Sequence, residues 1–222
     1  MLHGYAQFGN APAQRVKNAV DRSDLGSARS AFARAAELRP KYDAKKFAPL
    51  VQAVAKGVSH KDQEFSLAAV EALGELKFPG SGKHLHALLK PPAEEDKDRL
   101  SIHLAAIRAV GSIHDSASMK LLEKLLVGKR ADSAAAAAQA LVGYRNLDRK
   151  PRYGLMNRLV KVLEGLEKKI EKAGSDEARK DPARVRAALV ETLGRLGDGA
   201  SEDTAAGWTK WIRASKKADR GS

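Results

Sequence analysis

A twelve-residue pattern of apolar and polar positions recurs along the chain. In residues 65–76, Leu67, Ala69, Val70 and Leu73 follow the three- and four-residue spacing of one helix face. The pattern returns without a gap in residues 102–113 and 185–196, and in a weaker form in residues 133–144. Starts at 65, 102, 133 and 185 give steps of 37, 31 and 52 residues. A pair of helices with its turns needs roughly 30 to 45 residues, so the pattern predicts stacked helical pairs with one insertion.

A second amphipathic stretch follows each copy of the pattern, and Gly- and Pro-rich turns separate the stretches. We expect Gly74, Gly111 and Gly194 to end their helices in a left-handed conformation. The whole pattern predicts helices at 27–38, 43–57, 61–76, 81–90, 97–112, 116–127, 131–145, 152–172, 182–196 and 201–216. Residues 12–38 read as a degenerate helical pair, in which 13–20 precedes 28–38.

One copy of the pattern carries a family resemblance. Residues 185–198 read V-R-A-A-L-V-E-T-L-G-R-L-G-D, which resembles the HEAT-like repeats named after phycobilisome lyases, within the HEAT and armadillo group. The resemblance covers roughly residues 43–216 and implies an all-α, right-handed α-α superhelical solenoid of about ten helices. The family includes scaffolds, adaptor-like modules, chromophore lyase subunits, a deoxyhypusine hydroxylase and DNA glycosylases that remove alkylated bases. It therefore implies a fold without selecting one function.

The ends of a stack need units that cover its apolar faces. We interpret residues 1–40 as N-terminal capping helices with a flexible start, and residues 41–216 as the repeat solenoid. The extra length of the last step falls at about 164–181, where a charged helix extension is expected. Trp208 and Trp211 are three positions apart, which indicates a core stripe in a capping last helix. Residues 217–222 are predicted to be a disordered tail.

Composition narrows the chemistry. The sequence has no cysteine, which excludes disulfides, thiol nucleophiles and cysteine metal sites. No apolar run is long enough to span a membrane, and the first residues lack the pattern of a secretory signal. We expect a cytoplasmic monomer, while a periplasmic or secreted chain that has lost its leader remains an open alternative.

No catalytic constellation stands out. The six histidines form no His-x-x-x-His pair, and the His-Glu pairs of the deoxyhypusine hydroxylase do not occur. The aromatic and acidic residues of the glycosylases find no match residue by residue. We therefore expect no catalytic residue, no cofactor and no metal, and a protein that is not an enzyme.

The net charge of +13 is consistent with a soluble protein from a Lys/Arg-rich proteome. It also fits a negatively charged partner, which could be nucleic acid, an acidic membrane surface or an acidic protein. One cluster could bind phosphate or carboxylate groups through arginine and stack a base or ring on tyrosine. The alternative is a solvated loop with Tyr144 in the core. The residues of this candidate binding edge are Tyr144, Arg145, Arg149, Lys150, Arg152, Tyr153 and Arg158.

In HEAT stacks the second helix of each pair usually lines the concave face. The polar residues predicted there are Glu64, Glu71, Arg99, His103, Arg108, Gln139, Arg184, Glu191 and Arg195. A groove for nucleic acid should be uniformly basic, and this set has both signs. The sequence thus favours a non-enzymatic scaffold or adaptor that binds a protein partner through its concave face. The alternatives are nucleic-acid binding through the candidate binding edge and, less favoured, a HEAT-like DNA glycosylase.

Overall fold

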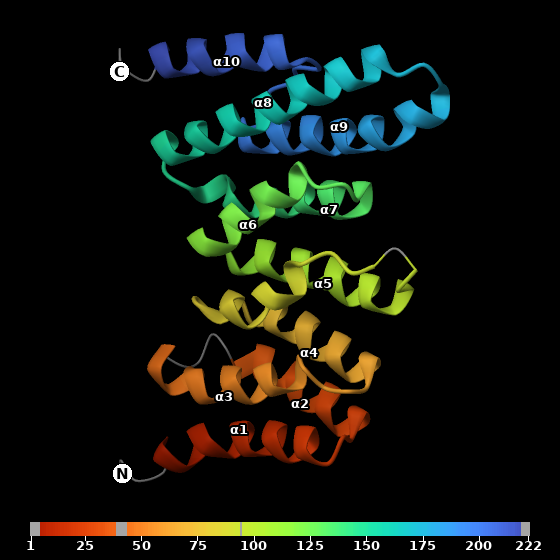
Figure 1. Cartoon of the computed structure of the whole chain (residues 1–222). Coiled ribbons are helices and arrows are strands. Elements are labelled where there is room, and N and C mark those ends of the chain that lie inside the picture. Colours follow the sequence, from red (N-terminus) through yellow and green to blue (C-terminus); the bar gives the residue numbers. More distant parts are fainter. Residues whose placement is uncertain (1–4, 39–43, 94, 219–222) are drawn as a thin grey trace. The chain divides into compact units, whose positions relative to one another are not determined.

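The chain folds into α-helices, as the apolar periodicity predicts. The computed structural model describes residues 5–38, 44–93 and 95–218, and these contain no β-strand. The all-α, repeat-like fold is therefore confirmed (Figure 1). The helices are α1 (Tyr5–Asp21), α2 (Leu25–Leu38), α3 (Ala44–Gly57), α4 (Gln63–Leu76), α5 (Lys97–Ile113), α6 (Ser116–Leu126), α7 (Ala131–Leu141), α8 (Arg149–Lys172), α9 (Asp176–Leu196) and α10 (Ala205–Ala218).

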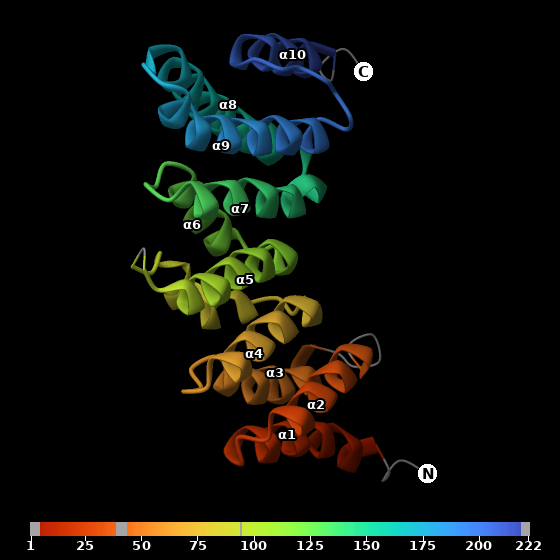
Figure 2. The same ribbon diagram turned by 90° about the vertical axis from the view of Figure 1, so that its right-hand side faces the viewer.

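The chain divides into two compact units, Met1–Ser118 (unit 1) and Met119–Ser222 (unit 2). In unit 1, α1 packs on α2 and α3, and α4 packs on α2, α3 and α5 (Figure 2). In unit 2, α9 packs on α7 and α8, and α10 packs on α8. The repeating sequence pattern runs through both units, so it contains no signal for the division between them.

Side-chain caps fix where several helices begin. Asp62 accepts a hydrogen bond from the backbone N–H of Phe65 at the start of α4, and Asp96 accepts one from Arg99 at the start of α5. Ser175 does the same for Ala178 at the start of α9. Each cap satisfies an N–H that the first helical turn leaves without a partner.

The expected helix-ending glycines lie inside their helices instead. Gly74 is followed by two more residues of α4, and the left-handed residue is Lys77, with φ of 45°. Gly111 is likewise inside α5, and Gly194 inside α9. At Gly74 the reason is packing, because a Cβ there would lie 2.9 Å from Cα of Ala109 on α5. The missing side chain lets α4 and α5 approach closely.

Replacing Lys77 with glycine should stabilise unit 1, since glycine adopts the left-handed conformation without the steric cost that a side chain carries. We expect a gain of about 0.5–1 kcal/mol in the free energy of unfolding, measured by denaturant titration. Lys161→Gly, in an exposed position inside α8, removes the same charge and should instead cost about 1 kcal/mol. Equal effects of the two substitutions would contradict this account.

The segment predicted as a helix at 81–90 is not an α-helix. It forms two short 3₁₀ helices, η2 (Ser81–His84) and η3 (His86–Leu89). Gly80 enters the segment with φ of 80°, and the backbone of Gly82 lies against the side chains of Asp115 and Ser118, which leaves no room for a Cβ. Gly82 in the first turn also disfavours an α-helix. Leu85 and Leu89 still reach the core, which explains the apolar spacing.

The other helices agree with prediction except near their ends. Helix α7 stops at Leu141 and continues as the 3₁₀ helix η4 (Val142–Asn146), whereas α8 and α9 begin before the predicted starts. Tyr5–Ala11, within the predicted flexible start, belong to α1, and Lys217 and Ala218, within the predicted tail, belong to α10. Residues 1–4 and 219–222 lie outside the described part of the chain. No helix in the described ranges has the length and apolarity needed to cross a membrane.

Candidate functional site

The start of α8 and the end of α9 are joined by an ion pair within unit 2. Both terminal nitrogens of Arg152 lie 3.1 Å from the carboxylate of Asp198, and Nη1 also donates to the backbone oxygen of Arg145 at 3.2 Å. Only 14% of the Arg152 side chain is exposed, against 72% for Asp198. A two-pronged arginine–carboxylate contact fixes direction as well as distance, so it holds η4, α8 and α9 in register.

A hollow of about 680 Å³ opens beside this ion pair. Its polar lining comes from η4, the first turn of α8 and the end of α9: Arg145, Asn146, Arg152, Glu191, Arg195 and Asp198. Arg195 donates to Glu191 at 2.7 Å, so two of the three guanidinium groups already face carboxylates. The hollow, which we call the Arg152 hollow, thus presents positive and negative groups side by side.

The Arg152 hollow brings together residues from both predicted sets. Arg145 and Arg152 belong to the candidate binding edge, and Glu191 and Arg195 belong to the predicted concave face. The sequence separation between these pairs is more than thirty residues, so only the packing of α9 against α8 and η4 makes them neighbours.

The other members of the candidate binding edge differ from expectation. Tyr144 is 2% exposed and Tyr153 is 8% exposed, so neither can stack on a base, and that part of the prediction is wrong. Tyr144 takes the position that the fully buried Leu76 holds in the first copy of the pattern. Tyr153 packs edge-on against Trp211, with ring centres 6.4 Å apart.

Arg158 also forms an ion pair within unit 2. It donates two hydrogen bonds to Glu123, at 2.7 and 2.8 Å, and these hold the pKa of Arg158 above its ordinary value. The other basic residues of the candidate binding edge are Arg145, Arg149 and Lys150, and their side chains are exposed.

One residue of the predicted concave face is buried. His103 is 2% exposed, and its Nδ1 donates to the backbone oxygen of Leu88 at 2.7 Å. It follows Ile102 as Ser66 follows Phe65, and Ser66 is buried too, donating to the backbone oxygen of Val58. The side chain at this position forms a hydrogen bond to a backbone oxygen of the preceding segment. The prediction that His103 lies on a binding face is therefore wrong. The exposed members are Glu64, Glu71, Arg99, Arg108, Gln139, Arg184, Glu191 and Arg195.

Equivalent positions of the repeat stay exposed on successive helices. Glu71 on α4 corresponds to Arg108 on α5 in unit 1, and Gln139 on α7 corresponds to Glu191 on α9 in unit 2. In unit 2 an ion pair joins Arg184 to Asp132 across the α7–α9 contact. At these equivalent positions the charge is negative at Glu71, positive at Arg108, zero at Gln139 and negative at Glu191, so no single sign prevails.

The histidines do not form a ligand cluster. Within the described ranges, no three His, Asp or Glu side chains gather closely enough to hold a metal ion. His86 instead forms a hydrogen bond of 3.0 Å with Ser118 in unit 1. Burial lowers the pKa of His84, and the charge of Lys83 lowers it further.

Comparison with known proteins leaves the family open. No family model and no curated protein matches this sequence. Among solved structures, the crystal structure of an engineered protein is similar, with a TM-score of 0.45 and 18% identity over 91% of this chain and 96% of that one. A second engineered protein gives a TM-score of 0.43 and 17% identity over 90% of this chain and 56% of that one. Neither likeness carries a function to this chain.

Proposed function

We propose that this chain is a non-enzymatic, HEAT-like repeat scaffold or adaptor that binds a protein partner through the exposed polar residues of its second helices. The observation that carries the proposal is the mixture of charge at equivalent exposed positions, which has Glu71 and Arg108 in unit 1 and Gln139 and Glu191 in unit 2. An interface with both signs selects a partner with the complementary pattern and rejects partners with the wrong one.

The Arg152 hollow supports the same function. A phosphate chain entering it would meet the carboxylates of Glu191 and Asp198 as well as the arginines. A protein surface can place an ammonium beside Glu191 and a carboxylate beside Arg145 or Arg195. Because both signs are exposed within one hollow, the match to a polypeptide is better than the match to a polyanion.

Nucleic-acid binding is the second candidate, and one observation favours it. Arg145, Arg149 and Lys150 have exposed side chains in one turn of unit 2, and the chain has a net charge of +13. Such a turn could contact a few phosphates without reading a sequence.

Exchanging two charges tests the proposal without altering the net charge. Glu191→Arg/Arg195→Glu keeps an ion pair at the same spacing on α9 but reverses its direction. The partner is recovered from an extract of the source organism and quantified by mass spectrometry. We expect the variant to recover about tenfold less of it, or less still, than the unaltered protein. The matched control is Glu164→Lys/Lys168→Glu, an exposed pair at the same spacing on α8, which should retain the partner.

The same samples separate the second candidate. Labelled single- and double-stranded DNA and RNA are titrated across a salt series. Micromolar binding with a steep salt dependence, lost in Arg145→Ala/Arg149→Ala/Lys150→Ala, would favour nucleic acid. Recovery of the same proteins by both charge-exchange variants would rule out the polar face as the binding surface.

A further inference from the structure

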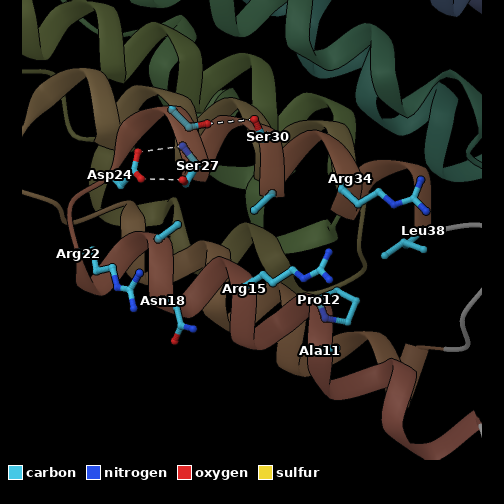
Figure 3. A pocket seen from close by; sticks show the side chains of 13 residues that line it. Ala11, Pro12, Arg15, Asn18, Arg22, Asp24, Ser27, Ser30, Arg34 and Leu38 are labelled. Carbon is cyan, nitrogen blue, oxygen red and sulfur yellow. Dashed lines mark hydrogen bonds between the residues drawn. The ribbon is translucent and has the colours of Figure 1, made fainter.

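Unit 1 has a groove that is lined by none of the candidate binding residues described above. It runs between α1 and α2 and has a volume of about 770 Å³ (Figure 3). Small apolar side chains form much of its lining, and three arginines stand along it. We call it the α1–α2 groove; its apolar members are Ala11, Pro12, Ala19, Ala31 and Leu38.

The second half of α1 and the residue after it supply most of the positive charge. Arg15 and Asn18 lie three residues apart on one side of α1, and Arg22 follows directly after its last residue, Asp21. Arg15 and Arg22 are both exposed, and within the described part of the chain no salt bridge joins either of them to a carboxylate. The charge of Arg22 acts on Asp24 and helps to lower the pKa of that carboxyl, whereas no such effect links Asp24 to Arg15.

Helix α2 forms the other side of the α1–α2 groove. Asp24 accepts hydrogen bonds from the backbone N–H and the hydroxyl of Ser27, at 3.0 and 2.6 Å. These bonds lower the pKa of Asp24 and hold it as the cap of α2. Arg34 pairs with Glu37 on the same helix. The net positive charge of the groove thus comes from Arg15 and Arg22. The one carboxylate among its described lining residues, Asp24, caps the start of α2.

We propose that the α1–α2 groove binds an acidic amphipathic helix of another protein. An apolar ridge of leucine-sized side chains would lie on Ala11, Pro12 and Ala31, which keep exposed surface, and flanking carboxylates would reach Arg15 and Arg22. Helices commonly bind in this way, with apolar residues at three- and four-residue spacing seated in a groove. This surface belongs to unit 1 and shares no residue with the Arg152 hollow of unit 2, so the inference goes beyond the proposed function.

Charge and polarity favour this occupant over two others. A second copy of the chain would bring a further net charge of +13 towards the arginines, and its α10 contains Lys210, Arg213, Lys216 and Lys217 with no acidic residue. Nucleic acid would satisfy the arginines but leave the apolar lining uncovered and place phosphate near Asp24. An acidic helix would cover the apolar lining and also place its carboxylates against the arginines.

Fluorescence anisotropy with a designed peptide tests the inference on the full chain. The probe is a labelled helical peptide of about 18 residues, with leucines along one face and glutamates beside them. We expect a micromolar dissociation constant that weakens with salt. Arg15→Glu/Arg22→Glu should weaken binding by roughly tenfold or more, because it replaces attraction with repulsion. Ala31→Gln, which places a longer polar side chain in the groove, should weaken it by about fivefold.

Matched controls decide the outcome. Lys17→Glu/Lys56→Glu makes the same change in net charge outside the groove and should alter the dissociation constant by less than about twofold. Glu191→Arg/Arg195→Glu should leave peptide binding unchanged, which separates this inference from the proposed function. Circular dichroism confirms that each variant is folded.

Three results would overturn the inference. The first is equal binding of a peptide with the same composition but scattered leucines, since charge alone would then explain the affinity. The second is equal weakening by the Lys17→Glu/Lys56→Glu control. The third is displacement of the peptide by duplex DNA that itself depends on Arg15 and Arg22, which would assign the groove to nucleic acid.

Discussion

Replacing Gly74 with alanine is expected to destabilise unit 1, although alanine is the better helix former. Gly74 lies inside α4, and a Cβ there would come within 2.9 Å of both Cα and Cβ of Ala109 on α5. Helix propensity alone predicts a gain of about 1 kcal/mol. Separation of the two helices should outweigh it and give a net loss of about 1 kcal/mol for Gly74→Ala, and about 2–3 kcal/mol for Gly74→Val.

Gly165 provides the matched control. It lies inside α8, is exposed, and a Cβ there would meet nothing within 4 Å. Gly165→Ala should therefore stabilise the protein by about 0.5–1 kcal/mol. Amide hydrogen exchange, followed by mass spectrometry on peptides from α4, α5 and α8, reports each helix separately. A stabilising effect at both glycines would show that the α4–α5 contact tolerates a methyl group.

Truncation of Trp208 should have the largest effect of any single substitution in unit 2. Its side chain is fully buried, packs against Trp211 with ring centres 5.8 Å apart, and touches the space beside Gly197. Trp208→Ala removes the largest core side chain, and the surrounding helices cannot easily move to fill the cavity that remains. We expect a loss of about 3–5 kcal/mol, measured as faster amide exchange in α8 and α10.

Phenylalanine at the same position separates packing from hydrogen bonding. The indole nitrogen of Trp208 is buried and has no hydrogen-bond partner among the described residues. Trp208→Phe therefore removes volume without breaking a hydrogen bond, and should cost about 1–2 kcal/mol. A loss as large as that of Trp208→Ala would indicate that the indole N–H contributes to stability.

Much of the fold follows from the sequence because helix formation here is local. Neighbouring residues alone reveal the apolar stripe of Leu67, Val70 and Leu73 and the cap at Asp62. Helix α4 begins directly after this cap and contains the whole stripe. The segment around Gly82 is different. Its 3₁₀ conformation depends on the side chains of Asp115 and Ser118, more than thirty residues away, so local periodicity could not distinguish it from an α-helix.

The candidate site was less predictable, since it depends on pairs distant in sequence. Arg152 and Asp198 are 46 residues apart, and Arg158 and Glu123 are 35 apart. A cluster of arginines in one turn cannot reveal that two of them are paired elsewhere. The burial of Tyr144 could be predicted, because the aligned copies place it at the apolar position of Leu76. The burial of His103 could not, because it aligns with Ser66, a polar residue whose burial only the structure shows.

The α1–α2 groove has only a weak signal in the sequence. Arg15, Asn18 and Arg22 have helical spacing, but a solvated polar face has the same spacing. Only the packing of α2 beside α1 places Ala31 and Leu38 opposite them and turns a charged helix side into a groove.

The hairpin of α8 and α9 shows where this chain can change length. Between residues 167 and 184 no side chain is fully buried, and local pairs such as Lys168 with Glu164 support its outer turns. Core packing therefore places no constraint on how many turns the hairpin contains. Each added turn on both helices would lengthen it by about 5 Å and leave the α7–α9 contact untouched. The turn at Ala173–Ser175 is accordingly a natural place to insert a reporter or a second binding module.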